Sequence, residues 1–126
     1  MRKRNAILSA LECFRDLSPG IVLSDLVVFL YVCENEGLNV TELAQLARMT
    51  EASASRRARS MGPPDMPYTL PPSMDLIGGF QGVDGRERLM YLTEKGVALR
   101  SRLDDIIARA QPITTGAKNS HDALVL

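Results

Sequence analysis

The sequence predicts a mainly α-helical (α+β) domain in which four helices precede a single β-hairpin and a fifth helix follows it. Three observations support this prediction. Residues 43–57 indicate two short helices joined by a tight turn, and Asp84-Gly85-Arg86 indicates a charged hairpin tip. Leu92-Thr93-Glu94-Lys95-Gly96 then indicates the end of a strand that is followed directly by a helix cap.

The length and composition indicate one small globular domain. The chain has 126 residues, 45% of them hydrophobic, and its 15 basic and 15 acidic residues give a formal net charge of zero. We expect a single domain over residues 1–112 and a flexible tail over residues 113–126. No apolar run approaches the length of a membrane span, and two cysteines without a disulfide or zinc spacing indicate a cytoplasmic protein with reduced thiols.

Residues that commonly carry out catalysis are scarce in this chain. The only histidine, His121, lies in the polar tail, and the two cysteines stand alone. The sequence contains no nucleophile that can be paired with a base, and no glycine-rich phosphate loop. It therefore predicts a protein that is not an enzyme and that binds neither a metal nor a cofactor.

The first two helices are predicted from the spacing of apolar residues. Apolar groups recur at the helical period through residues 4–17, and Pro19-Gly20 ends the segment. Ser24 or Asp25 is placed to cap a second helix, which Gly37 stops by adopting a left-handed conformation. This second helix is apolar on nearly every side, so we expect it at the buried centre of the domain.

The third and fourth helices form the predicted helix-turn-helix. Thr41 is expected to cap a helix over residues 42–48, directly after a single β contact at Val40, and Thr50 to cap the next helix, over residues 51–61. The inner face of this fourth helix holds Ala54, Ala58 and Met61, the opposite face Ala52, Arg56 and Arg59, and the flanks Ser53, Ser55, Arg57 and Ser60. The sequence therefore predicts a helix that packs closely on one side and presents arginines on the other.

A proline-rich segment separates the helix-turn-helix from the hairpin. Residues 62–75 contain five of the 7 prolines, so neither a helix nor a central strand can persist there, and we expect a stiff extended loop. Residues 76–80 and 88–92 then indicate paired strands. Thr93 is placed to cap a last helix, which Pro112 closes.

This order of elements, with its two motifs, resembles the MarR family of bacterial winged helix-turn-helix regulators over roughly residues 5–110. The matching motifs are Leu43-Ala44 through Ser55-Arg56 in the helix-turn-helix, and Asp84-Gly85-Arg86 with Leu92-Thr93-Glu94-Lys95-Gly96 at the hairpin. The resemblance implies a homodimer, formed by the N- and C-terminal helices, that binds a pseudo-palindromic operator in double-stranded DNA and regulates transcription. It also implies that helix 51–61 enters the major groove and that the wing, residues 80–88, reaches the minor groove.

The chain departs from the family pattern in three places. Relatives usually have a shorter link between the recognition helix and the wing, so segment 62–75 resembles an insertion. They also tend to have an apolar residue where Arg57 stands, and a further C-terminal helix where this chain has a short tail. These departures bear on the geometry of the dimer and on the spacing of the two operator halves.

The candidate DNA contacts on the fourth helix are serines and arginines. A guanidinium group can donate two hydrogen bonds to guanine or clamp a phosphate, which suits arginine to this role. We expect Ser53 and Arg56 to contact bases, and Ser55 and Arg59 to contact the backbone. The full candidate set, including the hairpin, is Thr50, Ser53, Ser55, Arg56, Arg57, Arg59, Asp84, Arg86 and Arg88.

Two arginines flank the predicted hairpin tip. A narrow minor groove concentrates negative potential, so Arg86 at this tip is expected to enter it. Asp84 can pair with Arg86 and stabilise the turn, and the two roles can coexist.

The sequence leaves two other functions open. The arginine face can instead bind an acidic protein partner, as in winged helices that serve as interaction modules. Alternatively, an unknown small-molecule effector or oxidation of Cys13 controls DNA release, because some relatives have a peroxide-sensing cysteine in this region; a buried structural Cys13 is the simpler interpretation. Cys33 is expected in the core, and Tyr68 either stacks or anchors the proline-rich segment.

Overall fold

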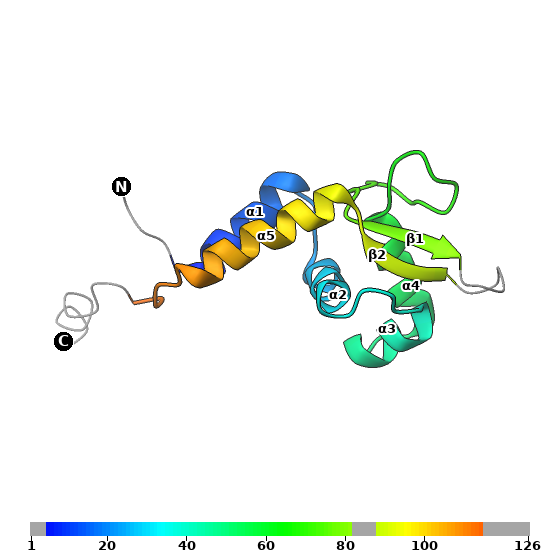
Figure 1. Ribbon diagram of the computed structural model, residues 1–126, viewed down its shortest axis with the longest axis horizontal. Helices are drawn as coiled ribbons and strands as arrows, with labels where there is room; N and C mark the ends of the chain where they lie inside the picture. The colour runs from blue at the N-terminus through cyan, green and yellow to red at the C-terminus, as the bar shows by residue number, and fades with distance from the viewer. Residues whose placement is uncertain (1–4, 82–87, 115–126) are drawn as a thin grey trace.

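The computed structural model describes residues 5–81 and 88–114 (Figure 1). Within these ranges the elements are α1 (Ala6–Leu17), α2 (Leu23–Glu34), α3 (Val40–Ala47), α4 (Glu51–Ser60), β1 (Ile77–Gln81), β2 (Arg88–Leu92) and α5 (Glu94–Ala108). The predicted order of four helices, one hairpin and a fifth helix is confirmed. The predicted hairpin tip, with Asp84 and Arg86, and the tail with His121 lie outside the described residues.

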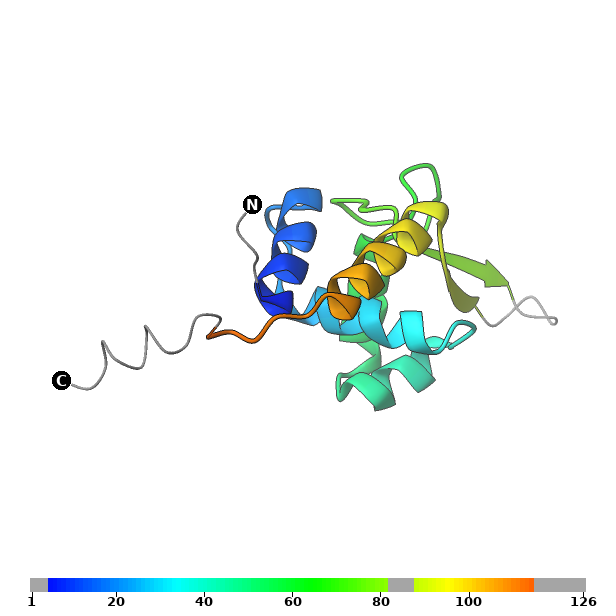
Figure 2. The ribbon, with the colours of Figure 1, turned by 60° about the vertical axis from the view of Figure 1, so that its left-hand side comes forward.

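The molecule consists of a lobe and an arm. α2, α3, α4 and the hairpin form the lobe, and α1 and α5 lie side by side in an arm that projects from it (Figures 1 and 2). α1 begins and α5 ends at the far end of this arm (Figure 1). No helix within the two described ranges is long and apolar enough to cross a membrane.

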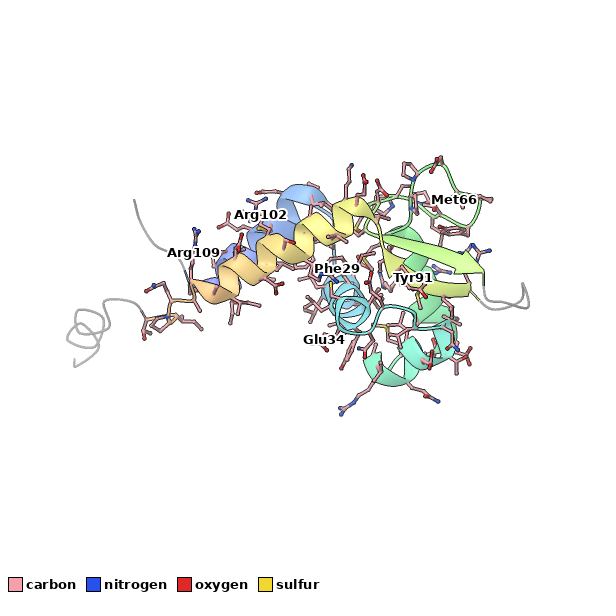
Figure 3. The ribbon with its side chains drawn as sticks, in the orientation of Figure 1. Phe29, Glu34, Met66, Tyr91, Arg102 and Arg109 are labelled. Atoms are coloured by element: carbon pink, nitrogen blue, oxygen red, sulfur yellow. The ribbon has the colours of Figure 1, made fainter. Side chains whose placement is uncertain are left out.

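α2 is the buried centre of the fold, as its apolar sequence predicts. Val28, Phe29 and Val32 of α2 have no exposed surface, and Figure 3 labels Phe29. Its ring meets that of Phe14 on α1 edge to face, with the ring centroids 5.8 Å apart. α2 also contacts α3, α4 and β2. It therefore joins the arm to the lobe through one continuous core.

Two of the predicted helix caps are confirmed. The Thr50 side chain accepts a hydrogen bond from the backbone N–H of Ser53 at 3.1 Å, which fixes the start of α4. The Thr93 side chain accepts one from the backbone N–H of Gly96 at 3.0 Å, which fixes the start of α5. α5 ends at Ala108, before the proline that was expected to close it.

The predicted starts of α2 and α3 are wrong by two to three residues. Asp25 lies inside α2 and reaches back, accepting a hydrogen bond from the backbone N–H of Val22 at 3.3 Å. α3 is capped by Asn39 instead of Thr41, because Asn39 and Glu42 form a reciprocal pair: each side chain accepts the other's backbone N–H, at 2.8 and 2.9 Å. An acidic residue in the third helical position thus determines both starts.

The hairpin is hydrogen-bonded to the residues that follow α2. β1 and β2 pair antiparallel, with Ile77 opposite Leu92, so the expected strands are shifted by one residue at β1 only. Gly37 donates its backbone N–H to the Met90 carbonyl at 2.7 Å, and Met90 donates back to Leu38 at 2.8 Å, so the β contact expected at Val40 falls at Leu38. Gly37 has φ 96°, the left-handed conformation that a glycine adopts without strain.

The proline-rich segment 62–75 is neither helix nor strand, as predicted, but it is not extended. It folds back along the end of α4, where Leu70 donates its backbone N–H to the Arg59 carbonyl at 2.9 Å and Met74 donates to Ser60 at 3.1 Å. The last carbonyls of a helix lack partners within the helix, so they attract donors from the following chain. The expectation of an extended loop is therefore wrong.

Candidate functional site

The helix-turn-helix is held by local hydrogen bonds at its turn. Arg48 ends α3 in the left-handed conformation, with φ 58° and ψ 47°, and turns the chain toward the Thr50 cap of α4. The Thr41 hydroxyl on α3 donates to a Glu51 carboxylate oxygen on α4 at 3.0 Å, so the first turns of the two helices are also joined. The orientation of α4 relative to α3 therefore follows from residues of the motif itself.

The inner face of α4 is buried, as the sequence predicts. Ala54 and Met61 have no exposed surface and Ala58 is 8% exposed. The alanine side chains allow α4 to approach α2 and α3 closely, since a single methyl group separates the helix backbone from its neighbours. The opposite face of α4 is therefore directed away from the core.

Arg56 is the clearest candidate for a DNA contact on the outer face. Its side chain is exposed, and it forms no hydrogen bond or ion pair with any residue in the described ranges. Ser53 is exposed one turn earlier on the same helix, and Thr50 caps that turn. Both N–H edges of the Arg56 guanidinium are thus available to a partner molecule.

Arg57 has a different position from the other candidates. Its Nη1 lies 3.6 Å from Oδ1 of Asp25, whose carboxylate is buried on α2. A buried carboxylate without a counter-charge is costly, so this guanidinium stabilises the contact between α2 and α4. We predicted Arg57 among the DNA contacts and did not predict this pair. The available signal was an acidic residue in the first turn of the most apolar helix.

Arg59 and Arg88 come together at Tyr68 of the proline-rich segment. Nε of Arg59 donates to the Tyr68 backbone carbonyl at 2.9 Å. The guanidinium carbon of Arg88, on β2, lies 4.4 Å from the centroid of the Tyr68 ring. The Tyr68 hydroxyl accepts a hydrogen bond from the backbone N–H of Gly79 at 3.1 Å. The anchoring role expected of Tyr68 is confirmed, and its cation–π contact with Arg88 was not predicted from the sequence.

An open groove of about 740 Å³ lies between α4, the start of α3 and the hairpin. Its polar lining includes Thr41, Ser55, Arg59 and Arg88, and Ala58 contributes to its apolar part. Ser55, expected at the DNA backbone, is half-buried on the α4 side of this groove. The groove can therefore accept an anionic group between a helix and a hairpin.

The remaining predicted site residues lie elsewhere. Asp84 and Arg86 fall outside the described residues, so their role at the wing tip stays a prediction.

Cys13 is buried in the core. Burial raises the pKa of the half-buried Cys33 thiol to about 11, from an ordinary value of 9.0. Across the described part of the chain, His, Cys, Asp and Glu side chains nowhere gather in a group of three that could bind a metal ion.

No protein-family model matches this chain, and no curated protein matches it in sequence. Solved structures are similar to it in fold. The transcriptional repressor CouR bound to a 23-mer DNA duplex superposes with a TM-score of 0.57 at 20% identity, over 95% of this chain and 82% of that one. A MarR transcriptional regulator from Methanosarcina mazei Go1 gives 0.58 at 15% identity, over 94% and 82%. Reduced AbfR bound to DNA gives 0.58 at 13%, over 92% and 74%. The predicted winged helix-turn-helix fold is thus confirmed.

Proposed function

We propose that this chain, which has the fold of the MarR-type regulators, is a member of that family: a homodimeric transcription regulator that binds specific sequences in double-stranded DNA. The observation on which this depends is the outer face of α4, where Arg56 is exposed and unpaired with any described residue on a helix backed by buried alanines. Two of the similar solved structures contain DNA, which supports the same assignment for this fold.

α4 enters the major groove in this proposal. Arg56 and Ser53 contact base edges, because both side chains are exposed on the face of α4 opposite the core. Arg59, Arg88 and Ser55, which line the groove between α4 and the hairpin, contact phosphates. Arg86, outside the described residues, is proposed to enter the minor groove.

We propose that Arg57 stabilises the fold and does not contact DNA. Its guanidinium lies beside the buried Asp25 carboxylate, and a direct DNA contact would require it to leave that counter-charge. Thr50 is proposed to act mainly as the α4 cap, with its backbone near the DNA.

The arm provides the dimer contact in this proposal. Along α1 and α5 several large apolar side chains are exposed, including Ile7 at 60% and Ile107 at 66%. Exposed apolar surface of this kind on neighbouring helices is typical of an interface. A second copy of the chain, related by a twofold axis, would cover both helices and present two α4 helices to the two halves of an operator.

The alternatives have less support. An interaction module with an acidic protein partner would use the same arginine face, and DNA titration distinguishes the two. A redox sensor at Cys13 is disfavoured because oxidation-sensing cysteines are accessible, whereas Cys13 is 7% exposed. The proposal includes a cytoplasmic location and control by a small-molecule effector.

The test is a titration of the purified protein with a labelled duplex from upstream of its own gene, beside a random duplex of equal length. We expect tighter binding to the upstream duplex, and a loss of about 10- to 100-fold for Arg56→Ala, as for an arginine that reads a base pair. Glu34→Ala is the control, because Glu34 is exposed at the end of α2 (Figure 3), outside α4, the groove and the arm. Equal binding of both duplexes by the wild type, or equal binding by Arg56→Ala, contradicts the proposal.

A further inference from the structure

Tyr68 contacts both parts of the lobe that are proposed to bind DNA. Its backbone carbonyl accepts from Arg59 of α4 at 2.9 Å. Its ring lies against the Arg88 guanidinium of β2, 4.4 Å from the centroid, and its hydroxyl accepts from Gly79 of β1 at 3.1 Å. One residue of the proline-rich segment therefore connects the recognition helix to both strands of the hairpin.

These contacts orient the two arginines but leave most of their donors available. Arg59 uses only Nε, so its two terminal nitrogens have no partner among the described residues. Arg88 contacts the ring through its guanidinium carbon, and its N–H groups form no hydrogen bond with any residue in the described ranges. Both side chains are exposed. Each can therefore donate to an anion while it remains in contact with Tyr68.

Gly79 allows Arg88 to reach this position. A Cβ at Gly79 would lie 2.9 Å from Cδ and 3.0 Å from Cγ of Arg88, closer than side-chain atoms normally approach. The aliphatic part of Arg88 therefore crosses the backbone of β1 where a side chain is absent. The position of the Arg88 side chain therefore depends on the missing side chain at Gly79 as well as on the Tyr68 ring.

The proline-rich segment brings Tyr68 to this place. The backbone of the segment forms hydrogen bonds to the last turn of α4 on both sides of Tyr68. The N–H groups of Gly62 and Leu70 both donate to the Arg59 carbonyl, at 3.2 and 2.9 Å. The position of Tyr68 relative to α4 is thus fixed by α4 itself. The hairpin is then placed relative to α4 through Tyr68.

We propose that Tyr68 is a positioning residue for DNA binding: it holds Arg59 and Arg88 on two sides of the groove between α4 and the hairpin, so that both contact the duplex backbone at once. This role rests on the proposed function. It assigns to segment 62–75 the task of setting the distance between the recognition helix and the wing. Tyr68 itself need not touch DNA.

The test compares variants of the full-length dimer by the salt dependence of their affinity for the upstream duplex. Tyr68→Leu removes the ring and the hydroxyl but no charge. We expect its affinity to fall about tenfold and the slope of log affinity against log salt to become less negative by about 1 to 2 per subunit, as phosphate contacts are lost. Tyr68→Phe retains the ring and should recover most of the wild-type slope.

A second variant disrupts the contact between Arg88 and Tyr68 without changing Tyr68. Gly79→Ala adds the Cβ that would displace the Arg88 side chain, and it leaves every charge and the ring in place. It should change the slope in the same direction as Tyr68→Leu, so the proposal remains testable if Tyr68→Leu folds poorly. Met66→Ala is the control, because Met66 is exposed in the same segment (Figure 3) and should bind as the wild type does.

The outcomes separate this inference from the function on which it rests. If the wild type binds the upstream duplex no better than random DNA, the proposed function fails, and the role of Tyr68 with it. If the wild type binds specifically while folded Tyr68→Leu and Gly79→Ala keep its affinity and slope, only the positioning role is overturned. A tenfold loss of affinity with an unchanged slope also overturns it, because phosphate contacts would then be intact.

Discussion

The outer face of α4 in the lobe and the helices of the arm expose different kinds of side chain. On α4 in the lobe, Ala54 and Ala58 are buried, and Arg56 and Arg59 are exposed. On α1 and α5 in the arm, large apolar residues such as Ile7 and Ile107 face outward although the two helices already pack on each other. The difference agrees with the two partners that we propose: DNA for the lobe, and a second copy of the chain for the arm.

The largest effect is expected from a charge placed on the arm. Ile107→Glu would bury an unpaired carboxylate in the proposed dimer interface, so we expect a monomer. Because a monomer can engage only half of an operator, its affinity should fall by roughly 100-fold or more. Mass measurement in solution, followed by the same DNA titration, checks both expectations. Leu30→Glu is the control, since Leu30 is 44% exposed on α2, outside α4, the groove and the arm; a dimeric Ile107→Glu would remove the basis of the comparison.

The junction between lobe and arm should be sensitive to a single methyl group. Gly96 lies in the first turn of α5, and a Cβ there would overlap the backbone carbonyl of Leu76. Backbone cannot yield as a flexible side chain does, so Gly96→Ala should lower the free energy of unfolding by about 2 to 3 kcal/mol. Urea denaturation measures the change. Gly20→Ala is the control, because a Cβ at Gly20 would meet nothing within 4 Å; equal stability of the two variants would contradict the assigned contact.

The ion pair inside the lobe should matter for stability and little for specificity. Asp25→Ala removes the counter-charge of Arg57 and the acceptor for the Val22 backbone N–H. Because the Arg57 side chain is 38% exposed, water compensates part of the loss, and we expect about 1 to 2 kcal/mol in chemical denaturation.

The double variant Asp25→Ala/Arg57→Ala tests whether the two residues act as a pair. Removing both charges should cost less than the sum of the two single changes, since neither charge is then left alone. If Arg57→Ala instead weakens DNA binding as strongly as Arg56→Ala does, while stability is unchanged, the assignment of Arg57 to the fold is wrong.

At neutral pH the smallest effect is expected from Cys33, whose thiol lies near Arg100 of the arm. Burial raises the pKa of its thiol to about 11, above the ordinary 9.0, and Arg100 opposes this shift in part. Below pH 9 the thiol is protonated in both states, so stability is unaffected. As pH rises from 9 to 11 the unfolded chain loses this proton first, and the free energy of unfolding should fall. Thermal unfolding of Cys33→Ala over this range should show a shallower decline; parallel curves would refute the assignment.

The parts of the fold that follow local rules were predictable from the sequence. The Thr50 and Thr93 caps, the alanine spacing of α4 and the apolar length of α2 each depend on residues within a few positions of one another. The starts of α2 and α3 were predicted too late, because Ser24 or Asp25 and Thr41 were expected to be the caps. Asp25 and Glu42 instead occupy the third position of their helices, and each accepts a hydrogen bond from the backbone N–H three residues earlier.

The site was predictable as a face but not as a set of contacts. The outward direction of Arg56 follows from helical periodicity. The engagement of Arg57 with Asp25, and of Arg59 and Arg88 with Tyr68, depends on partners brought together by tertiary packing. Composition showed that the proline-rich segment forms no helix or strand, but it gave no information on which carbonyls its backbone donors would reach.

The two ends of segment 62–75 meet, because the Asp75 backbone N–H donates to the Gly62 carbonyl at 3.0 Å. The chain leaves and returns at one point, so extra residues added at the exposed Pro64-Asp65 would enlarge the loop without separating its ends. This makes the tip of the segment a practical attachment point for a fluorescent label or an affinity tag. Such a label would report whether the protein is bound to DNA in living cells, and every residue of α4 would remain unmodified.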